Sequence, residues 1–341
     1  MKKIISIISL LLFILSNSFG QDVSFSQFYE LPLLRNPALA GLYKGDFRAT
    51  AAIRSQWQSV TTPYVTQALG LETKFGTNEN SDNYLALGVQ ALNDIAGDSK
   101  LGKTAILPVL TYHKSLSEDN DTYLSLGVMA GPVQQRFDVS KMSFDDQFVN
   151  GSYSETNPTR QNFSNSNITY IDASVGMVFS SAFSDGIKYY VGGSYFHFNK
   201  PKVAFDQSKD VVLNKKIIVN AGLSAATSDN DKIILYGDYF QQGGNSQFQG
   251  GFMFMHDLIQ ENEDETISLS AGTFLRWNDA VIPVLKLDYY KFGIGVTYDV
   301  NISKLSAASK ARGGFEITMS YRNFLNIRNS SLTKTRCPVN F

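Results

Sequence analysis

The chain has very few of the residues on which disulfide, metal and nucleophilic chemistry depend. Its 341 residues include one cysteine, Cys337, and three histidines. A single cysteine excludes an internal disulfide framework. No HExxH, GxSxG or Cys-His spacing is present around the histidines, which are His113, His197 and His256. We therefore expect no enzyme, no catalytic residue, no cofactor and no metal site.

The chain also lacks an excess of charge of either sign. Its formal net charge is −1, and its basic residues are scattered. This distribution excludes the basic patch of a nucleic-acid-binding protein, so no nucleic-acid partner is expected. Acidic clusters at residues 117–121 and 228–232 do not have the spacing of a calcium-binding EF-hand loop, and polar turns explain them better.

Long apolar runs are absent after the first twenty residues. Lys2 and Lys3 precede an apolar run at residues 4–15, and the small residues Ser18 and Gly20 follow it, which predicts a signal peptide over residues 1–20 that is cleaved on export. The only cysteine lies far from this segment, so no lipid anchor is expected there. No later stretch offers the about 20 apolar residues that a membrane helix needs.

What the chain contains instead is alternation of apolar and polar residues with a period of two, which is typical of β-strands. Residues 292–301 read FGIGVTYDVN, with Phe, Ile, Val, Tyr and Val on one face and Gly, Gly, Thr, Asp and Asn on the other. Residues 266–277 and 314–322 separate almost as completely. An all-β fold follows.

About fourteen such segments can be counted, and most run ten to twelve residues, as strands that cross an outer membrane do. An even number of antiparallel strands closes into a barrel without exposed edges. No linker divides the chain, so we predict one antiparallel transmembrane β-barrel over residues 47–322, with a periplasmic tail over residues 323–341. The predicted strands are residues 47–58, 65–75, 83–93, 104–115, 122–135, 168–179, 187–198, 215–227, 232–242, 246–257, 266–277, 280–289, 292–301 and 314–322.

The two faces of these strands predict which side meets lipid. The polar face is rich in Gly, Ser, Thr and isolated charges, which suits a wet or plugged lumen, and the apolar face would then contact lipid. Aromatic residues near strand ends fit the interfacial girdles of such barrels, although ordinary core packing would also explain each of them. These residues are Phe47, Trp57, Phe75, Phe179, Trp277 and Tyr321.

Loop lengths suggest an orientation, because outer-membrane barrels alternate short periplasmic turns with longer outer loops. With the N-terminus inside, the longest connection, residues 136–167, faces outward. Its length exceeds what joining two strands requires. Because it interleaves aromatic and acidic residues, we expect a partner-binding surface there, with inward folding as a cap as the alternative. The candidate residues are Phe144, Asp145, Asp146, Gln147 and Phe148.

Residues 21–46 form an N-terminal segment that cannot itself be a strand, since it contains LRNPALAGLYKG. A segment of this kind directly before the first strand is suited to fold back and plug the lumen. A disordered periplasmic leader is the alternative. The candidate plug residues are Arg35, Asn36, Pro37 and Gly41.

Several stretches in order along the chain resemble the PorP/SprF family of type IX secretion system membrane proteins. They are FSQFYELPLLRNPALAG, IRSQW, FDDQF, RWNDAVIP, GVTYDVNISKL, GGFEITMSY and the final CPVNF. The resemblance implies an outer-membrane barrel that works with the type IX secretion and gliding-motility machinery. It also implies a docking role, with a secreted surface protein or adhesin and periplasmic components of the system as partners. The tail departs from the family pattern, because Val339 and Asn340 stand where a basic residue is expected.

A channel or transporter for a small ligand is the alternative function, because fourteen strands can enclose a lumen. An open lumen would favour the channel, and a plugged lumen would favour the docking platform.

Overall fold

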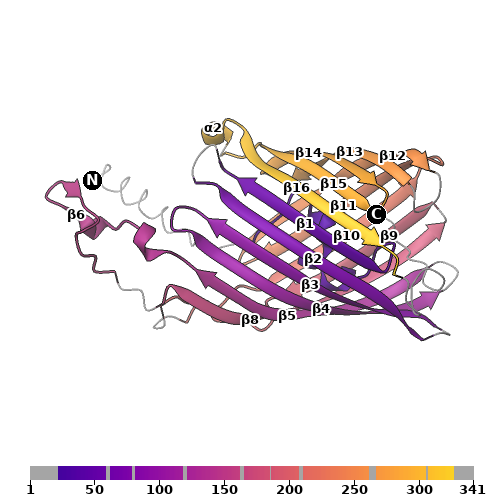
Figure 1. The fold of residues 1–341 in the computed structure, drawn as a ribbon, viewed down its shortest axis with the longest axis horizontal. Helices are drawn as coiled ribbons and strands as arrows, with labels where there is room; N and C mark the ends of the chain where they lie inside the picture. Colours follow the sequence, from indigo (N-terminus) through magenta and orange to yellow (C-terminus); the bar gives the residue numbers. More distant parts are fainter. Residues whose placement is uncertain are drawn as a thin grey trace, which may run out of the picture.

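The computed structural model describes residues 22–58, 62–78, 81–117, 121–161, 165–184, 186–206, 210–260, 266–304 and 306–325. The predicted signal peptide and almost all of the predicted tail, with Cys337, lie outside these residues. Within them the chain forms one closed barrel of fourteen antiparallel strands (Figure 1). The all-β barrel predicted from the alternation is confirmed.

Each strand of the wall pairs with its neighbour in sequence, and β1 pairs with β16 to close the sheet. Residues 137–166 join β5 to β8 and carry a separate two-stranded sheet of β6 and β7. The strands are β1 Phe47–Gln56, β2 Tyr64–Asn78, β3 Ser81–Ala96, β4 Leu101–Ser117, β5 Thr122–Arg136, β6 Phe148–Val149, β7 Ser152–Tyr153, β8 Asn167–Ser184, β9 Ile187–Phe196, β10 Lys216–Ala226, β11 Asp231–Gln242, β12 Asn245–Gln260, β13 Thr266–Arg276, β14 Ala280–Tyr289, β15 Phe292–Asn301 and β16 Arg312–Asn323.

Burial along the strands follows the period of two that the sequence shows. In β14, buried and exposed residues alternate without exception from Ala280 to Tyr289. Exposed positions carry large apolar side chains such as Leu285 and Leu287, whereas Lys286 and Asp288 are buried. Successive side chains of a strand point to opposite faces, so the outer face is the apolar one. This is the arrangement a lipid-facing wall requires.

The barrel interior is filled by residues 22–46, which we call the lumen segment. It contains three short 3₁₀ helices, η1 Phe28–Glu30, η2 Pro32–Leu34 and η3 Pro37–Leu39. Pro32 and Pro37 each start such a turn, because proline has no N–H to donate and its fixed φ suits a first helical position. The segment therefore satisfies its backbone in tight turns and offers no edge to the wall.

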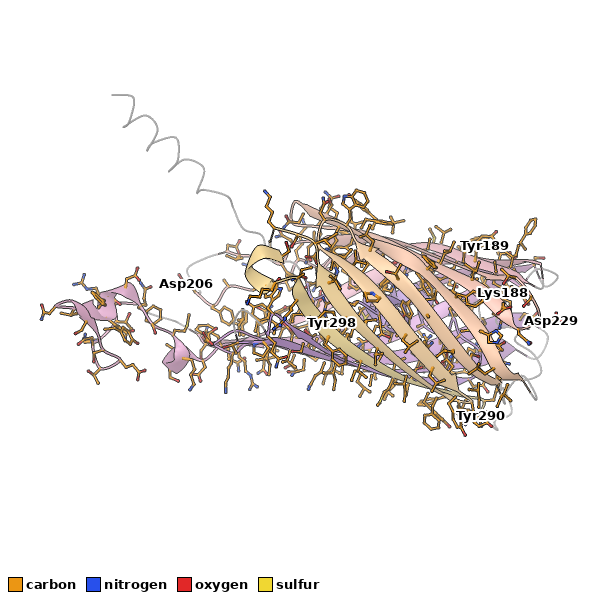
Figure 2. The ribbon with its side chains drawn as sticks, turned by 90° about the horizontal axis from the view of Figure 1, so that it is seen from above. Lys188, Tyr189, Asp206, Asp229, Tyr290 and Tyr298 are labelled. Carbon is orange, nitrogen blue, oxygen red and sulfur yellow. The ribbon has the colours of Figure 1, made fainter. Side chains whose placement is uncertain are left out.

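The two ends of the barrel differ. At one end, the long-loop rim, lie residues 137–161 and residues 197–206. At the other end, the short-turn rim, lie tight turns such as residues 290–291. In Figure 2, Asp206 lies at the long-loop rim, and Tyr189 and Tyr290 lie toward the short-turn rim. The lumen segment runs between them, since Asp22 contacts the long-loop ends of β4 and β10, and Asp46 precedes β1 at the other rim.

Helical elements are few among the described residues. Besides the turns of the lumen segment they comprise η4 Val139–Lys141, η5 Asp145–Gln147 and α2 Ser306–Ser309. None of the helices in the described part of the chain has the length and hydropathy of a membrane-spanning helix.

Candidate functional site

The candidate site has two parts, the lumen segment and an arm that projects from the long-loop rim. Along its whole length the lumen segment is held by side chains that point inward from the wall.

At the long-loop rim, Asp22 is held by three cationic or titratable side chains. Lys103 of β4 lies 2.9 Å from one carboxylate oxygen, and His197 Nε2 lies 2.7 Å from the other. The second ring nitrogen of His197 is 2.8 Å from Asp172 of β8. Lys216 is farther away, with its Nζ 3.9 Å from Asp22.

This cluster shifts the pKa values of Asp22 and His197. Burial alone would raise the pKa of Asp22, but the charge of Lys103 and the hydrogen bond to His197 outweigh it and hold that pKa well below the ordinary value. Burial alone would lower the pKa of His197, yet its hydrogen bonds to Asp172 and Asp22 raise it. Both shifts favour the ion-paired form of the cluster.

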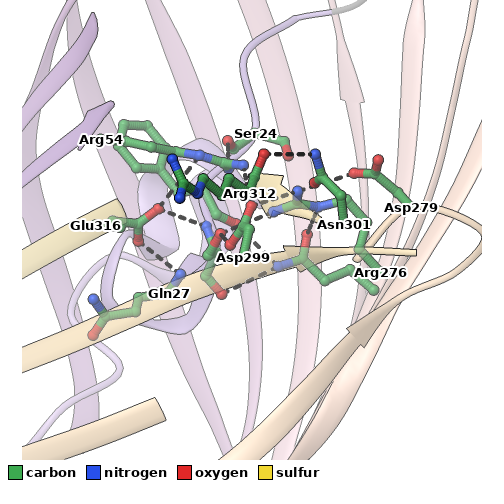
Figure 3. A network of polar contacts seen from close by, with 12 residues as sticks. Ser24, Gln27, Arg54, Arg276, Asp279, Asp299, Asn301, Arg312 and Glu316 are labelled. Carbon is green, nitrogen blue, oxygen red and sulfur yellow. Dashed lines mark hydrogen bonds and ion pairs between the residues drawn. The ribbon is translucent and has the colours of Figure 1, made fainter. Parts of the chain in front are cut away.

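Deeper in the lumen, a charge network fixes residues 24–27 of the lumen segment (Figure 3). Glu316 of β16 accepts hydrogen bonds from the backbone N–H groups of Ser26 and Gln27, both at 2.7 Å. Asp299 of β15 accepts from the Ser26 hydroxyl at 2.5 Å. The Glu316 carboxylate thereby satisfies the N–H groups of two residues that belong to no strand.

Two arginines complete this network. Arg54 of β1 lies 2.6 Å from Asp299 and also donates to the Ser24 carbonyl. Arg276 of β13 lies 2.9 Å from Asp299 and donates to the Ser26 hydroxyl at 2.9 Å. The residues of the network come from both sides of the closure between β1 and β16, so the network fastens the segment to the place where the barrel closes.

Near the middle of the lumen, Arg35 makes a two-pronged ion pair with Asp238 of β11. Its Nε and Nη2 lie 2.6 Å and 2.5 Å from the two carboxylate oxygens. The guanidinium also lies 4.9 Å from the ring centre of Phe28. Both members of the pair are buried, so each depends on the other to remain charged inside the barrel.

The Asn36-Pro37-Ala38 sequence fits a hollow in the wall. The Asn36 side chain accepts a hydrogen bond from the Ala38 N–H at 2.9 Å, and donates to the carbonyls of Met177 and Gly193 at 3.1 Å each. The wall is glycine at the points of contact. A Cβ at Gly127 would lie 2.5 Å from the Ala38 nitrogen, and one at Gly176 would lie 2.9 Å from Asn36 Cγ. Only glycine leaves room for this turn.

Toward the short-turn rim, the wall again supplies the partners of the segment's backbone. His113 Nε2 is 2.7 Å from the Ala40 carbonyl, and Glu72 accepts from the Gly41 N–H at 3.0 Å. Gly41 has a φ of +79°, and a Cβ there would lie 2.5 Å from Ala86 Cβ. A larger residue at this position would be strained and would also collide with the wall.

Aromatic packing supports the same placement. The rings of Tyr29 and Tyr236 stack with centres 5.0 Å apart, and Phe28 meets Phe274 edge to face at 5.5 Å. Phe274 is an inward-facing apolar residue on an otherwise polar face of β13, and Ala280, Ile282 and Val284 give the inner face of β14 an apolar stretch. The lumen thus has its own hydrophobic core, shared by the segment and the wall.

Two cavities remain beside the lumen segment. One lies between Tyr29, Arg48 and Arg322 on the side of the short-turn rim. The other lies between Phe25, Phe240 and Lys216 on the side of the long-loop rim. Arg35 lines both cavities, so its ion pair with Asp238 stands between them.

The second part of the site is the arm, residues 138–161, which extends away from the barrel (Figure 1). At its base, Phe137 packs edge to face on Phe205 of the neighbouring loop, with ring centres 4.8 Å apart. Its tip is the small hairpin of β6 and β7, where Phe148 is 59% exposed and Tyr153 is 43% exposed.

The predicted partner-binding residues lie within this arm. Gln147 is buried, and it accepts from the Phe144 N–H and from the Asn157 side chain. Asp146 accepts hydrogen bonds from Thr159 and from the Arg160 N–H. Phe163, another aromatic of this connection, lies outside the described residues. The arm is an ordered unit that presents Phe148 outward.

The histidines serve as hydrogen-bonding groups in this structure. His113 lies fully buried between Ser125 and Ala40, and His197 lies between two aspartates as described. His256 Nδ1 is 2.7 Å from Asp231 near the short-turn rim. Among the described residues, no group of three or more His, Cys, Asp or Glu side chains has the arrangement of a metal site.

The structure brings together four charged residues that are not among the candidate site residues predicted from the sequence. Arg54, Arg276, Asp299 and Glu316 lie far apart in the chain and meet around residues 24–27. A signal was available, since each occupies a polar-face position in a predicted strand. Isolated charges on the inner faces of strands mark lumen contacts, but their partners could not be assigned without the strand register.

Comparisons with known proteins agree with this architecture. The sequence model described as "Type IX secretion system membrane protein PorP/SprF" matches residues 17–321. No curated protein sequence is significantly similar to the chain. Among solved structures, the Ralstonia pickettii toluene transporter TbuX superposes with a TM-score of 0.50 at 9% identity, covering 90% of this chain and 96% of that one. A FadL homologue from Pseudomonas aeruginosa gives a TM-score of 0.49 at 7% identity, covering 84% and 92%. The likeness to TbuX concerns the fold alone.

Proposed function

The chain belongs to the PorP/SprF family of type IX secretion system membrane proteins, and on that basis we propose that it is a docking platform in the outer membrane. Its partners in this proposal are a secreted surface protein or adhesin and periplasmic components of the secretion and gliding machinery. The single observation that carries the proposal is the filled lumen. Asn36, Ala38 and Ala40 are fully buried inside the barrel, which supports a lumen that the segment blocks.

The arm supplies the binding surface in this proposal. Phe148 and Tyr153 are exposed on an ordered hairpin that stands clear of the wall. Aromatic side chains surrounded by polar groups are typical anchors at protein interfaces. In the proposed orientation the long-loop rim faces the outside of the cell, so the arm would meet a protein that has crossed the membrane. No catalytic step is needed for this role.

The test is co-purification from native membranes in a mild detergent. The variant Phe144→Ser/Phe148→Ser is expected to assemble normally and to lose the co-purifying protein. Phe198→Ser is the matched control, because Phe198 is also an exposed aromatic at the long-loop rim but lies outside the arm. Full recovery of the partner with the double variant would remove the arm as the binding surface.

A channel or transporter for a small ligand is the second candidate function. The two cavities beside the lumen segment support it, since they lie toward opposite rims and Arg35 lines both of them. The superposed TbuX structure is that of a toluene transporter, although at 9% identity the likeness supports the fold and not the cargo. Conductance in a planar bilayer separates the two candidates: a large steady conductance supports the channel, and silence supports the platform.

A further inference from the structure

The cavity on the side of the long-loop rim has a predominantly apolar lining. It lies between the lumen segment and strands β10 to β12. Phe25 and Leu31 of the segment and Ile218 and Phe240 of the wall line it, and all four are at least nine-tenths buried. A lining of this kind suits a small hydrophobic group.

One cation in the lining has no close partner. Lys216 is 7% exposed, and its nearest carboxylate oxygen, on Asp22, is 3.9 Å away, beyond hydrogen-bond distance. Asp22 is itself engaged at shorter distances by Lys103 and His197. Within the described part of the chain, no hydrogen bond to the Lys216 ammonium is found.

The carboxylate in the lining, Asp238, does not compensate for this. Asp238 is held at both oxygens by Arg35, at 2.6 Å and 2.5 Å. Lys216 instead lies over aromatic faces, 5.1 Å from the ring centre of Phe240 and 5.9 Å from that of Phe196. A buried ammonium without a hydrogen-bonded anion is energetically costly, and a carboxylate that reached it would recover that cost.

We propose that this cavity binds a small amphipathic monoanion, with its carboxylate on Lys216 and its hydrocarbon part between Phe25, Ile218 and Phe240. A medium-chain fatty acid or an arylalkanoic acid has this chemistry. The ligand lies between the lumen segment and the wall, so its binding holds the segment in place. The site does not depend on the docking role of the arm, which lies outside the barrel.

The test compares octanoate with octanol, which share a hydrocarbon chain and differ in charge. Both are titrated calorimetrically into the mature full-length protein in lipid nanodiscs, with empty nanodiscs as the background for partitioning. Octanoate is expected to bind at least about tenfold more tightly, as one charge-assisted hydrogen bond implies. Equal binding of the two compounds by the unaltered protein overturns the proposal.

Two variants identify the site. Lys216→Met keeps the stem and removes the charge, so octanoate should lose its advantage over octanol. Lys202→Met is the control, because Lys202 is an exposed lysine paired with Asp210 outside the lumen. Ile218→Trp fills the cavity and should abolish binding of both compounds. Unchanged octanoate binding in either cavity variant overturns the proposal, and heat modifiability on unboiled gels establishes that each variant is assembled.

Discussion

The lumen segment and the arm both lie outside the strands of the barrel wall, and both carry aromatic residues. They differ in the solvent exposure of those residues. Phe28 and Tyr29 of the segment are buried, whereas Phe148 and Tyr153 of the arm are exposed. The difference lies in what the wall offers each of them. Inward-facing charges and glycines meet the segment along its length, while the arm is held mainly by hydrogen bonds within itself. Burial of a non-strand segment therefore requires complementary positions on several strands.

The largest effect on conductance and stability is expected when the lumen segment is removed. Deleting residues 22–41 leaves every strand-to-strand hydrogen bond in place, so the barrel should still assemble with a strand-rich circular dichroism spectrum. It should show a steady conductance in planar bilayers where the full chain is silent. The free energy of unfolding should fall by many kcal/mol, since each large apolar side chain buried in the lumen contributes about 1.5–3 kcal/mol. An unchanged conductance would show that the segment does not block the lumen.

The next largest effect is expected from the central ion pair. Arg35→Met leaves Asp238 buried and without its partner, which should lower the free energy of unfolding by about 3–5 kcal/mol. Urea unfolding of the refolded protein in lipid vesicles measures it. The double variant Arg35→Met/Asp238→Leu should recover part of the loss, because no unpaired charge remains. A single variant as stable as the unaltered protein would contradict a structural role for the pair.

The glycines of the wall give a smaller and more local effect. Gly176→Val places a side chain where Asn36 and Pro37 lie, so the segment must shift, at about 1–3 kcal/mol for an overpacked site. Gly76→Val is the matched control, since a Cβ at Gly76 meets nothing within 4 Å. Unfolding in urea should separate the two variants. If Gly76→Val were equally destabilising, the hollow would not be specific to the lumen segment.

A substitution in the arm should leave the stability of the barrel almost unchanged, unlike the substitutions at the lumen segment. Replacing exposed Phe148 with Ser should change the free energy of unfolding by less than about 0.5 kcal/mol, as surface substitutions usually do. The same urea titration provides the measurement. A loss comparable to that of Arg35→Met would mean that the arm packs against the barrel and is not a free surface.

The smallest expected effect is the pH dependence of the ion-paired cluster of Asp22, Lys103 and His197 at the long-loop rim. The pKa of His197 is raised in the folded chain, so its contribution is complete below the ordinary value of about 6.5 and is lost as the pH rises through the raised pKa. The pKa of Asp22 is lowered, so its contribution is lost only as the pH falls through that lowered value. Hydrogen-exchange protection of the Asp22 N–H, which donates to the Gln242 side chain at 2.8 Å, should therefore weaken a few-fold as the pH rises through the raised pKa of His197. His197→Gln should abolish the alkaline part of this dependence, and a variant that retained it would exclude His197 as its source.

Much of the wall was predictable because alternation is a local property. The faces of residues 292–301 follow from the period of two, and Thr297 and Asp299 are buried while Phe292 and Ile294 are exposed. The strand count and the closed barrel followed from the same pattern. Inward-facing Phe274 could not be recognised as a core residue, since its partner Phe28 belongs to the lumen segment, far away in the sequence.

The sequence by itself determined the strands, their lipid-facing side and the presence of a segment at residues 22–46 that proline and glycine keep out of the sheet. Only the tertiary structure decided which charges meet. Arg54 and Glu316 become neighbours because β1, the first strand of the barrel, pairs with β16, the last. The register of this pairing places Arg54 opposite Glu316. Period-two alternation depends on adjacent residues, whereas the partners of Ser26, Arg35 and Asn36 depend on strand pairings that span the whole chain.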